Sequence, residues 1–423
     1  MNFFSRLEKR LYSFMADYFR FFANFSLKRW QPRVIAITGS VGKTTMLNLV
    51  EFELGKKAHY SHDANSPFGV PFDVLGLKGI KSCRLLWIYL VLAAPIRGLF
   101  YTHKEKFYVV EIDGDRPDGA RKLAEWLKPE LTIWVSLGRS HVCHFDDAVK
   151  AGKFETVEDA ITSEFASLAK NTQKIVYIDA DEPMMVEATK NLDVKVVEFK
   201  KSDMKKYLIY PNSTDFSAGA TTFHFNQPEP RELSIQLLML KSLCEYLKID
   251  LKTDFSNLKI APGRSTFLKG KNGLEIIDSS YNAHLSSMKS ILNMAKSLHA
   301  SHKWLIIGDI VEAGSIEAEE HRSLADLIAE VEAEEVILVG PRTKKYTAPR
   351  LKELGISPKT TLDPKKALEY IEKNSHGRET LIFKGSQYLE WIIEKLLENP
   401  EDAKLLPRRD PAARKRRAKR GLN

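Results

Sequence analysis

The sequence predicts an α/β protein with two unequal domains, the first built on a mostly parallel sheet and the second a smaller Rossmann-like domain. The 423 residues are too many for one ordinary hydrophobic core. Strand-like apolar runs alternate with helical patterns along the chain, which is typical of parallel sheets. A Pro-Gly segment, "APGRS", follows a helical stretch near 231–248 and divides the runs into two series. The runs are 34–38, 107–113, 131–137 and 174–180 in the first series, and 274–280, 303–309, 335–340 and 380–385 in the second.

The N-terminal segment, 1–32, is predicted to be amphipathic, aromatic and helical, with one or two helices. Its ten aromatic side chains are interspersed with basic residues. Two explanations stay open: the aromatic rings pack on the first domain, or they bind the interface of an anionic membrane. An apolar run at 85–96 is too short to span a bilayer, which takes about twenty residues, and predicts a buried or interfacial helix.

The remaining boundaries place the first domain at 33–270, the second at 271–400 and a basic tail at 401–423. Residues 408–420 hold eight basic residues and one acid, and we expect this tail to be disordered and solvated. The body between the two basic ends is mildly acidic, so no nucleic-acid partner is expected.

Three cysteines far apart indicate a reducing compartment, and no secretory signal is evident. We therefore expect a cytoplasmic protein, peripheral at the inner membrane face if the N-terminal segment binds lipid, and a monomer. His141, Cys143 and His144 do not make a zinc site, because no fourth ligand stands at a suitable spacing.

A phosphate-binding loop is predicted at "ITGSVGKTT", between a strand and a helix. Glycines let backbone N–H groups surround a phosphate, and the helix N-terminus adds partial positive charge. Lys43 is expected to reach the β- and γ-phosphates, and the Thr44 hydroxyl to bind Mg²⁺. The loop is two residues shorter than the standard Gly-x4-Gly-Lys form. The expected nucleotide-binding residues of this loop are Gly39, Ser40, Val41, Gly42, Lys43, Thr44 and Thr45.

This short loop and six later blocks, in order, resemble the Mur ligases, the ATP-dependent amide ligases of peptidoglycan synthesis. The resemblance is greatest to the branch that adds D-alanyl-D-alanine to the UDP-linked tripeptide, without that branch's N-terminal UDP-binding domain. It covers nearly the whole chain after residue 33. The blocks are "NSPFGVP", 109–145, "APGRS", "IIDSSYNAHLSSM", 306–321 and "FKGSQ".

The resemblance implies ATP and Mg²⁺ as cofactors and a small-molecule peptide or amino acid as substrate. It implies Lys43, Glu111 and His141 as catalytic residues, and Thr44, Glu111 and His141 as Mg²⁺ ligands. Lys384 and Ser386 are expected to bind the substrate carboxylate. Further nucleotide contacts are expected from Gln236, Arg264, Asp278, Asn282 and His284, with Tyr281 in the same segment.

Two departures from the family pattern are expected to affect catalytic turnover. Ser136 stands where Asn is usual, and Thr162 falls where a carbamylated lysine commonly holds a second Mg²⁺; threonine forms no carbamate. The expected activity is amide formation through an acyl phosphate. A catalytically reduced relative that binds ATP as a partner or scaffold, and another P-loop phosphotransferase, remain alternatives.

Overall fold

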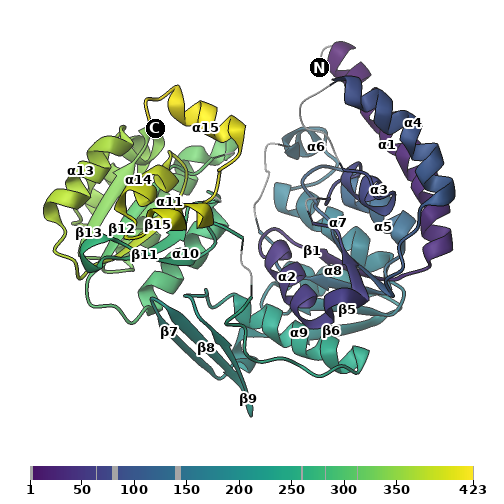
Figure 1. Cartoon of the computed structure of the whole chain (residues 1–423), viewed down its shortest axis with the longest axis horizontal. Coiled ribbons are helices and arrows are strands. Elements are labelled where there is room, and N and C mark those ends of the chain that lie inside the picture. Colours follow the sequence, from purple (N-terminus) through teal and green to yellow (C-terminus); the bar gives the residue numbers. More distant parts are fainter. Residues whose placement is uncertain are drawn as a thin grey trace. The chain divides into compact units, whose positions relative to one another are not determined.

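The first unit of the fold is built on a six-stranded parallel sheet. The computed structural model describes residues 3–62, 64–78, 84–138, 144–258, 261–281, 283–311 and 313–422. These divide into two compact units, of which the first holds the described residues up to Gly138, residues 144–200 and residues 242–248. Its strand order is β2-β3-β1-β4-β5-β6, and every pair is parallel (Figure 1). The strands are β1 (Arg33–Thr38), β2 (Ala58–Tyr60), β3 (Phe107–Glu111), β4 (Leu131–Trp134), β5 (Ile175–Asp179) and β6 (Lys195–Phe199).

The central strands of this sheet are buried along their whole length and are mostly apolar, because helices cover both of their faces. Every residue of β3, β4 and β5 is buried, which explains why these strands show no polar–apolar alternation in the sequence. The helices are α1 (Phe3–Trp30), α2 (Lys43–Leu54), α3 (Gly69–Val74), α4 (Arg84–Phe100), α5 (Gly119–Leu127), α6 (Asp146–Lys150), α7 (Val157–Lys170) and α8 (Pro183–Thr189).

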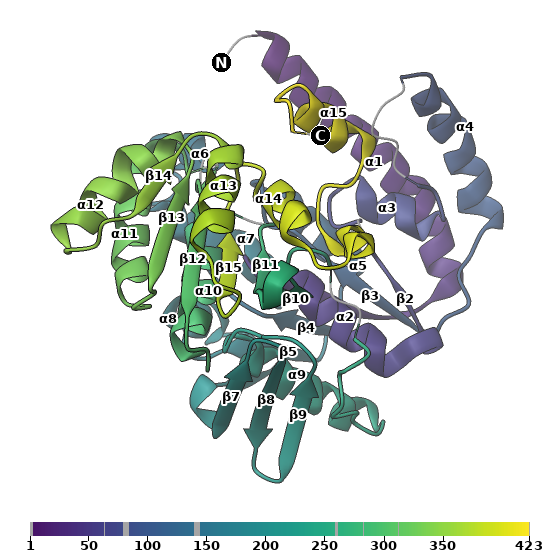
Figure 2. The same cartoon turned by 60° about the vertical axis from the view of Figure 1, so that its left-hand side comes forward.

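The second unit contains a small antiparallel sheet and a second six-stranded sheet. The antiparallel strands are β7 (Lys206–Tyr210), β8 (Ser213–Ala218) and β9 (Thr221–Phe225), drawn in teal in Figure 2. The larger sheet has the order β10-β11-β15-β12-β13-β14, and only the β10–β11 pair is antiparallel. Its strands are β10 (Thr266–Lys269), β11 (Glu275–Ser279), β12 (Lys303–Gly308), β13 (Glu335–Val339), β14 (Lys359–Thr361) and β15 (Thr380–Lys384).

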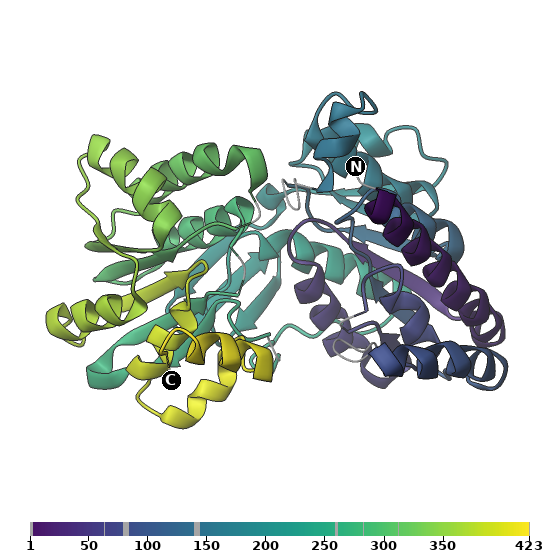
Figure 3. The same ribbon diagram turned by 90° about the horizontal axis from the view of Figure 1, so that it is seen from above.

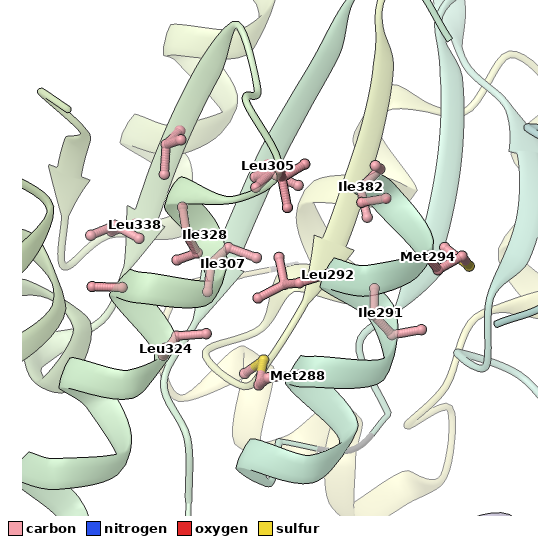
Figure 4. Packing of buried hydrophobic residues seen from close by; sticks show 14 of the residues in the cluster. Met288, Ile291, Leu292, Met294, Leu305, Ile307, Leu324, Ile328, Leu338 and Ile382 are labelled. Atoms are coloured by element: carbon pink, nitrogen blue, oxygen red, sulfur yellow. The ribbon is translucent and has the colours of Figure 1, made fainter. Parts of the chain in front are cut away.

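Helices pack on this second sheet through two clusters of buried aliphatic side chains. Figure 4 shows one cluster, in which Met288 and Leu292 pack with Leu305 and Leu324. The helices are α10 (Leu285–Ser297), α11 (Glu317–Ala329), α12 (Ala348–Glu353), α13 (Pro364–Asn374), α14 (Leu389–Leu396) and α15 (Pro411–Ala418). The remaining long helix, α9 (Leu233–Leu247), contributes residues to both units. The α/β class predicted from the sequence is confirmed. The domain boundaries at 270 and 400 stay predictions; residues 201–241 group with the second unit.

The C-terminal segment corrects one expectation, because residues 401–422 are folded and not disordered. The short helix Pro400–Leu405 and α15 pack on the second unit, and Leu406 and Leu422 are buried in its core. Arg409 and Arg417 both bond the Glu394 carboxylate, at 2.9 and 2.6 Å. Figure 3 shows this yellow segment lying against the green strands. Three of the basic residues, Arg408, Arg409 and Arg417, thus have carboxylate partners on α14, which lies outside the tail itself.

The N-terminal segment forms one helix, α1, that packs against α4 and α3. Phe19 and Ala23 are fully buried there, and the Tyr18 hydroxyl donates to the Val91 carbonyl. The run at 85–96 lies within α4, which buries Leu90 but leaves several large apolar side chains exposed. In the described part of the chain, no helix is long and apolar enough to cross a membrane.

Candidate functional site

The loop between β1 and α2 has the backbone of a phosphate cradle. Gly42 lies in the left-handed region at φ 87° directly before α2, and Gly39 has φ 138°. A Cβ atom at Gly39 would lie 2.8 Å from the Ser136 carbonyl oxygen, so only glycine fits without a shift. No side chain caps the N-terminus of α2, and its first turn holds no acid. The first N–H groups of this twelve-residue helix are therefore suited to an anion.

Lys43 is paired within the first unit. Its ammonium lies 2.7 Å from the Asp113 carboxylate and donates to the Gly39 carbonyl at 2.6 Å. The Asn65 side chain donates to the other Asp113 oxygen at 2.6 Å and thereby fixes this carboxylate. Asp113 is a functional candidate that the sequence analysis did not single out, although it lies in one of the matched blocks. Its signal is its position two residues after the end of β3.

Thr44 and Glu111 are brought together as the Mg²⁺ prediction requires. The Thr44 hydroxyl donates to Glu111 Oε2 at 3.0 Å, and Glu111 is largely buried at the end of β3. The Glu111 backbone N–H donates to the Ser61 hydroxyl, which fixes the strand end. A hydroxyl and a carboxylate are the oxygen ligands that Mg²⁺ prefers, so these two residues fit the ion. His141, the third predicted ligand, lies outside the described residues.

Ser136, a departure from the family pattern, holds the phosphate loop in place. Its hydroxyl donates to the Val41 carbonyl at 2.7 Å and accepts from the Val41 N–H at 2.9 Å. Next to it, the Ser40 hydroxyl donates to the Gly138 carbonyl and accepts the Gly138 N–H. Two serine side chains therefore fasten the loop to the segment that follows β4. In the sequence Ser136 stands out only as a substitution, and no local pattern reveals this role.

Thr162 is buried in α7, and its one described hydrogen-bond contact is the Met184 sulfur at 4.0 Å. Two residues on, the Glu164 carboxylate accepts the N–H groups of Asp118, Ala120 and Arg121 at the start of α5. Burial raises the pKa of Glu164. Glu164 therefore anchors the start of α5, and Thr162 contributes no charge to the unit.

The second unit gathers three of the predicted residues into a charged cluster, which we call the Arg264 cluster: the half-buried Arg264 and the buried Asp278 and Lys384. Burial raises the pKa of Asp278 to about 6. Burial, followed by the Arg264 charge, lowers the pKa of Lys384 to about 7. Among the described residues, Arg264 Nε and Asp278 Oδ2 are buried with no hydrogen-bond partner. These groups carry bonding capacity that a polar ligand could satisfy.

The remaining predicted residues of the second unit differ in whether their polar groups already have partners. Gln236 Oε1 on α9 is another buried acceptor without a partner among the described residues, which fits a ligand N–H such as that of adenine. Tyr281 stacks under the Arg264 guanidinium at 5.1 Å. His284 precedes α10 and makes no side-chain cap. The Ser386 hydroxyl donates to the Asp309 carbonyl at 2.9 Å, which joins the end of β15 to β12. Asn282 lies outside the described residues.

Comparisons with known proteins give this arrangement a family context. Residues 263–387 match the family "Mur ligase, glutamate ligase domain". The UDP-N-acetylmuramoyl-tripeptide–D-alanyl-D-alanine ligase of Bacillus subtilis is 24% identical over 395 residues, covering 88% of this chain and 78% of that protein. The corresponding Borreliella burgdorferi ligase is 24% identical over 341 residues, covering 75% of this chain and 64% of that protein.

Solved structures are similar over most of the chain. The MurF ligase from Thermotoga maritima in complex with ADP has a TM-score of 0.72 at 19% identity and covers 92% of this chain and 84% of that one. MurF from Acinetobacter baumannii has a TM-score of 0.70 at 19% identity, with 90% and 80% covered. The chain therefore carries a Mur ligase C-terminal domain and is homologous to the MurF ligases, which form amide bonds with ATP in peptidoglycan precursor synthesis. The resemblance inferred from the sequence blocks is confirmed.

Proposed function

We propose that this homologue of the MurF ligases is an ATP- and Mg²⁺-dependent ligase that joins a carboxylate to the amine of an amino acid or peptide. A substrate carboxylate would attack the γ-phosphate of ATP, forming an acyl phosphate and releasing ADP. The amine would then displace phosphate and form the amide. Peptidoglycan precursor synthesis is the proposed setting, since that is where its homologues act.

One contact carries this proposal: the Thr44 hydroxyl on Glu111 at the end of the phosphate loop. Bound there, Mg²⁺ would neutralise charge on the transferred phosphoryl group. Lys43 and the N-terminus of α2 would bind the phosphates. Lys43 would exchange its bond to Asp113 for one to phosphate oxygen, so Asp113 holds the lysine in position until the nucleotide arrives.

The Arg264 cluster is the proposed recognition element for anionic groups in the second unit. Arg264 would bind nucleotide phosphate and Lys384 the substrate carboxylate. Each anionic ligand group would compensate a positive charge, and for Lys384 that charge is buried. Gln236, Asp278 and His284 would contact the nucleoside. The Ser386 hydroxyl donates to Asp309, so it would meet a substrate as an acceptor.

Thr162 supports a second candidate function, in which the chain binds ATP but turns it over slowly. A buried threonine beside Met184 supplies no carboxylate for a second metal ion. Under this alternative the protein acts as a nucleotide-dependent partner or scaffold. Replacing Thr162 by lysine distinguishes the two: a rise in Mg²⁺-dependent turnover supports a ligase weakened at its second metal site.

The test is release of ADP and phosphate from ATP against a panel of peptidoglycan precursors, with and without D-alanyl-D-alanine. We expect release that requires both a carboxylate and an amine substrate. Glu111→Gln should lower it about a hundredfold or more, the scale of lost transition-state charge stabilisation. The same substitution at an exposed glutamate, Glu155→Gln, serves as the control and should leave the release unchanged. Phosphate release that ignores the amine would favour another phosphotransferase, and none at all would favour the scaffold.

We propose that the enzyme works in the cytoplasm, at the inner face of the membrane, as a monomer and without a nucleic-acid partner. The net charge of the body supports the last point: it is mildly acidic, and nucleic-acid binding normally requires a positive net charge that attracts the phosphate backbone.

A further inference from the structure

Helix α4 presents a continuous apolar stripe outside the core. Its exposed large side chains recur at helical spacing, and Leu92, Ile96 and Phe100 are 66%, 62% and 82% exposed. The opposite side of the helix, marked by Leu90 and Ala94, is buried. A soluble protein rarely exposes so many large apolar residues on one helix unless they contact a partner. The stripe consists of Ile88, Tyr89, Leu92, Ile96, Leu99 and Phe100.

Helix α1 adds exposed phenylalanines beside this stripe. The two helices run parallel and in contact, since Tyr18 bonds Val91 and Arg29 bonds the Gly98 carbonyl (Figure 1). On α1, Phe14 and Phe21 are exposed, whereas Phe19 is fully buried. The aromatic rings of the N-terminal helix therefore divide, some packing on the first unit and some facing outward.

The exposed residues of the two helices face the same way. Residues of an α-helix advance by about 100° each. On α1, Phe21 lies about a quarter turn from the side that touches α4; on α4, Leu92 and Leu99 lie about a quarter turn from the side that touches α1. Both directions point away from the buried side, so the two stripes adjoin. We call this combined surface the α1–α4 face.

Helices α1 and α4 carry a net positive charge. Together α1 and α4 contain eight basic residues and two acids, and neither acid is on α4. Lys28 and Arg29 are exposed at the end of α1, beside the end of α4. The rest of the chain outside the two basic ends is mildly acidic, so this positive charge is local.

We propose that the α1–α4 face binds the surface of an anionic lipid bilayer, with both helices lying in the interface. Apolar side chains without hydrogen-bonding groups suit acyl chains, and flanking cations suit anionic headgroups. A protein partner would need hydrogen bonds, about one per 100–200 Å² of interface, and within the stripe only Tyr89 offers a hydroxyl. This inference concerns a surface apart from the phosphate loop and stands whether or not the chain is a ligase.

The experiment is co-sedimentation of the full chain with vesicles. Phosphatidylglycerol–phosphatidylethanolamine vesicles are compared with pure phosphatidylcholine at low and high salt. We expect binding to the anionic vesicles that weakens with salt. The double variant Leu92→Glu/Ile96→Glu should lose at least about tenfold in binding, because it places two acids in the acyl region. Leu362→Glu, an equally exposed apolar position in the second unit, should bind normally.

Further measurements separate this proposal from its competitors. Thermal unfolding and ATP turnover of the double variant should match those of the parent chain, since both side chains are exposed and far along the sequence from the loop. Lys28→Glu tests the charge component and should weaken binding several-fold. Equal binding to both vesicle types overturns the electrostatic part. No vesicle binding, with self-association that the double variant abolishes, overturns the proposal in favour of contact between copies.

Discussion

The phosphate loop of the first unit and the Arg264 cluster of the second differ in how their charges are compensated. Around the loop, Lys43 pairs with Asp113, Thr44 bonds Glu111 and Ser136 closes on Val41. In the Arg264 cluster, Arg264 Nε and Asp278 Oδ2 have no partner among the described residues, and Lys384 has a lowered pKa. The side chains around the loop are paired before any ligand binds, whereas the cluster holds buried polar atoms that have no partner among the described residues and that a ligand could satisfy.

This difference predicts opposite responses to mutation. Removing a side chain from the loop breaks existing hydrogen bonds or ion pairs, so the fold loses stability and nucleotide binding is weakened at the same time. Removing Lys384 from the cluster relieves the burial of a cation, so the fold gains stability while the function is lost. Residues that serve binding or catalysis commonly make a protein less stable than it would be without them.

The largest effect is expected for Lys43→Ala. The substitution should abolish stabilisation by Mg-ATP, which at saturating nucleotide is worth roughly a few kcal/mol. Thermal unfolding with and without Mg-ATP measures this shift, and Lys56→Ala, at an exposed position after α2, is the control. Equal nucleotide shifts in the parent chain and Lys43→Ala would refute the phosphate-loop assignment.

Lys384→Met should stabilise the chain in a pH-dependent way. The pKa of Lys384 is about 7 folded and 10.5 unfolded, so between these values the unfolded chain holds the extra proton. Stability of the parent chain therefore rises with pH across that window, and the full cost is present below about pH 7. The variant should gain on the order of a few kcal/mol below pH 7, reduced because Asp278 loses a nearby cation.

Chemical denaturation at several pH values measures this gain for Lys384→Met. Lys352→Met, at an exposed site on α12, should show no such pH dependence. A variant that is less stable at every pH would show that Lys384 is compensated after all, and the contrast between the two regions would fail.

The smallest effect is expected for Ser136→Ala. The change removes a hydroxyl that both donates to and accepts from Val41, so the free energy of unfolding should fall by about 1 kcal/mol. Affinity for ADP should fall several-fold, because the loop loses a fixed point. Calorimetric titration with ADP measures this affinity, and Ser202→Ala, at an exposed position, is the control. Unchanged affinity would mean that the glycines and Ser40 fix the loop without Ser136.

The fold and the loop were predictable because their signals are local. Buried parallel strands such as β3 and β5 appear in the sequence as mainly apolar runs, and Gly39, Gly42 and Lys43 lie within five consecutive residues. The bond from Asn65 to Asp113 joins residues 48 positions apart, which no local pattern reveals. The contact of Thr44 with Glu111 spans 67 positions and was expected only through resemblance to a family.

The tail was mispredicted for the same reason. Its composition indicates disorder, yet Arg417 pairs with Glu394, which lies 23 positions earlier on α14. A local signal did exist: Asp410 precedes Pro411 and caps α15 by accepting the N–H groups of Ala412 and Ala413. Asp-Pro is a typical helix start, and the buried positions Leu406 and Leu422 are apolar. The count of basic residues outweighed these signals.

The folded tail makes protease sensitivity a reporter for the second unit. Residues 408–420 contain eight potential trypsin sites, more closely spaced than anywhere else in so short a stretch of the chain. Four of these sites, 414–417, lie in α15, which packs through Ala413 and Arg417, and the buried Leu422 fixes the chain after it. The peptide bonds of the helix are therefore held away from the extended form that a protease needs. Cleavage there would report opening of the tail and not the mere presence of lysine and arginine. A ligand that binds the second unit should therefore slow trypsin cleavage in the tail.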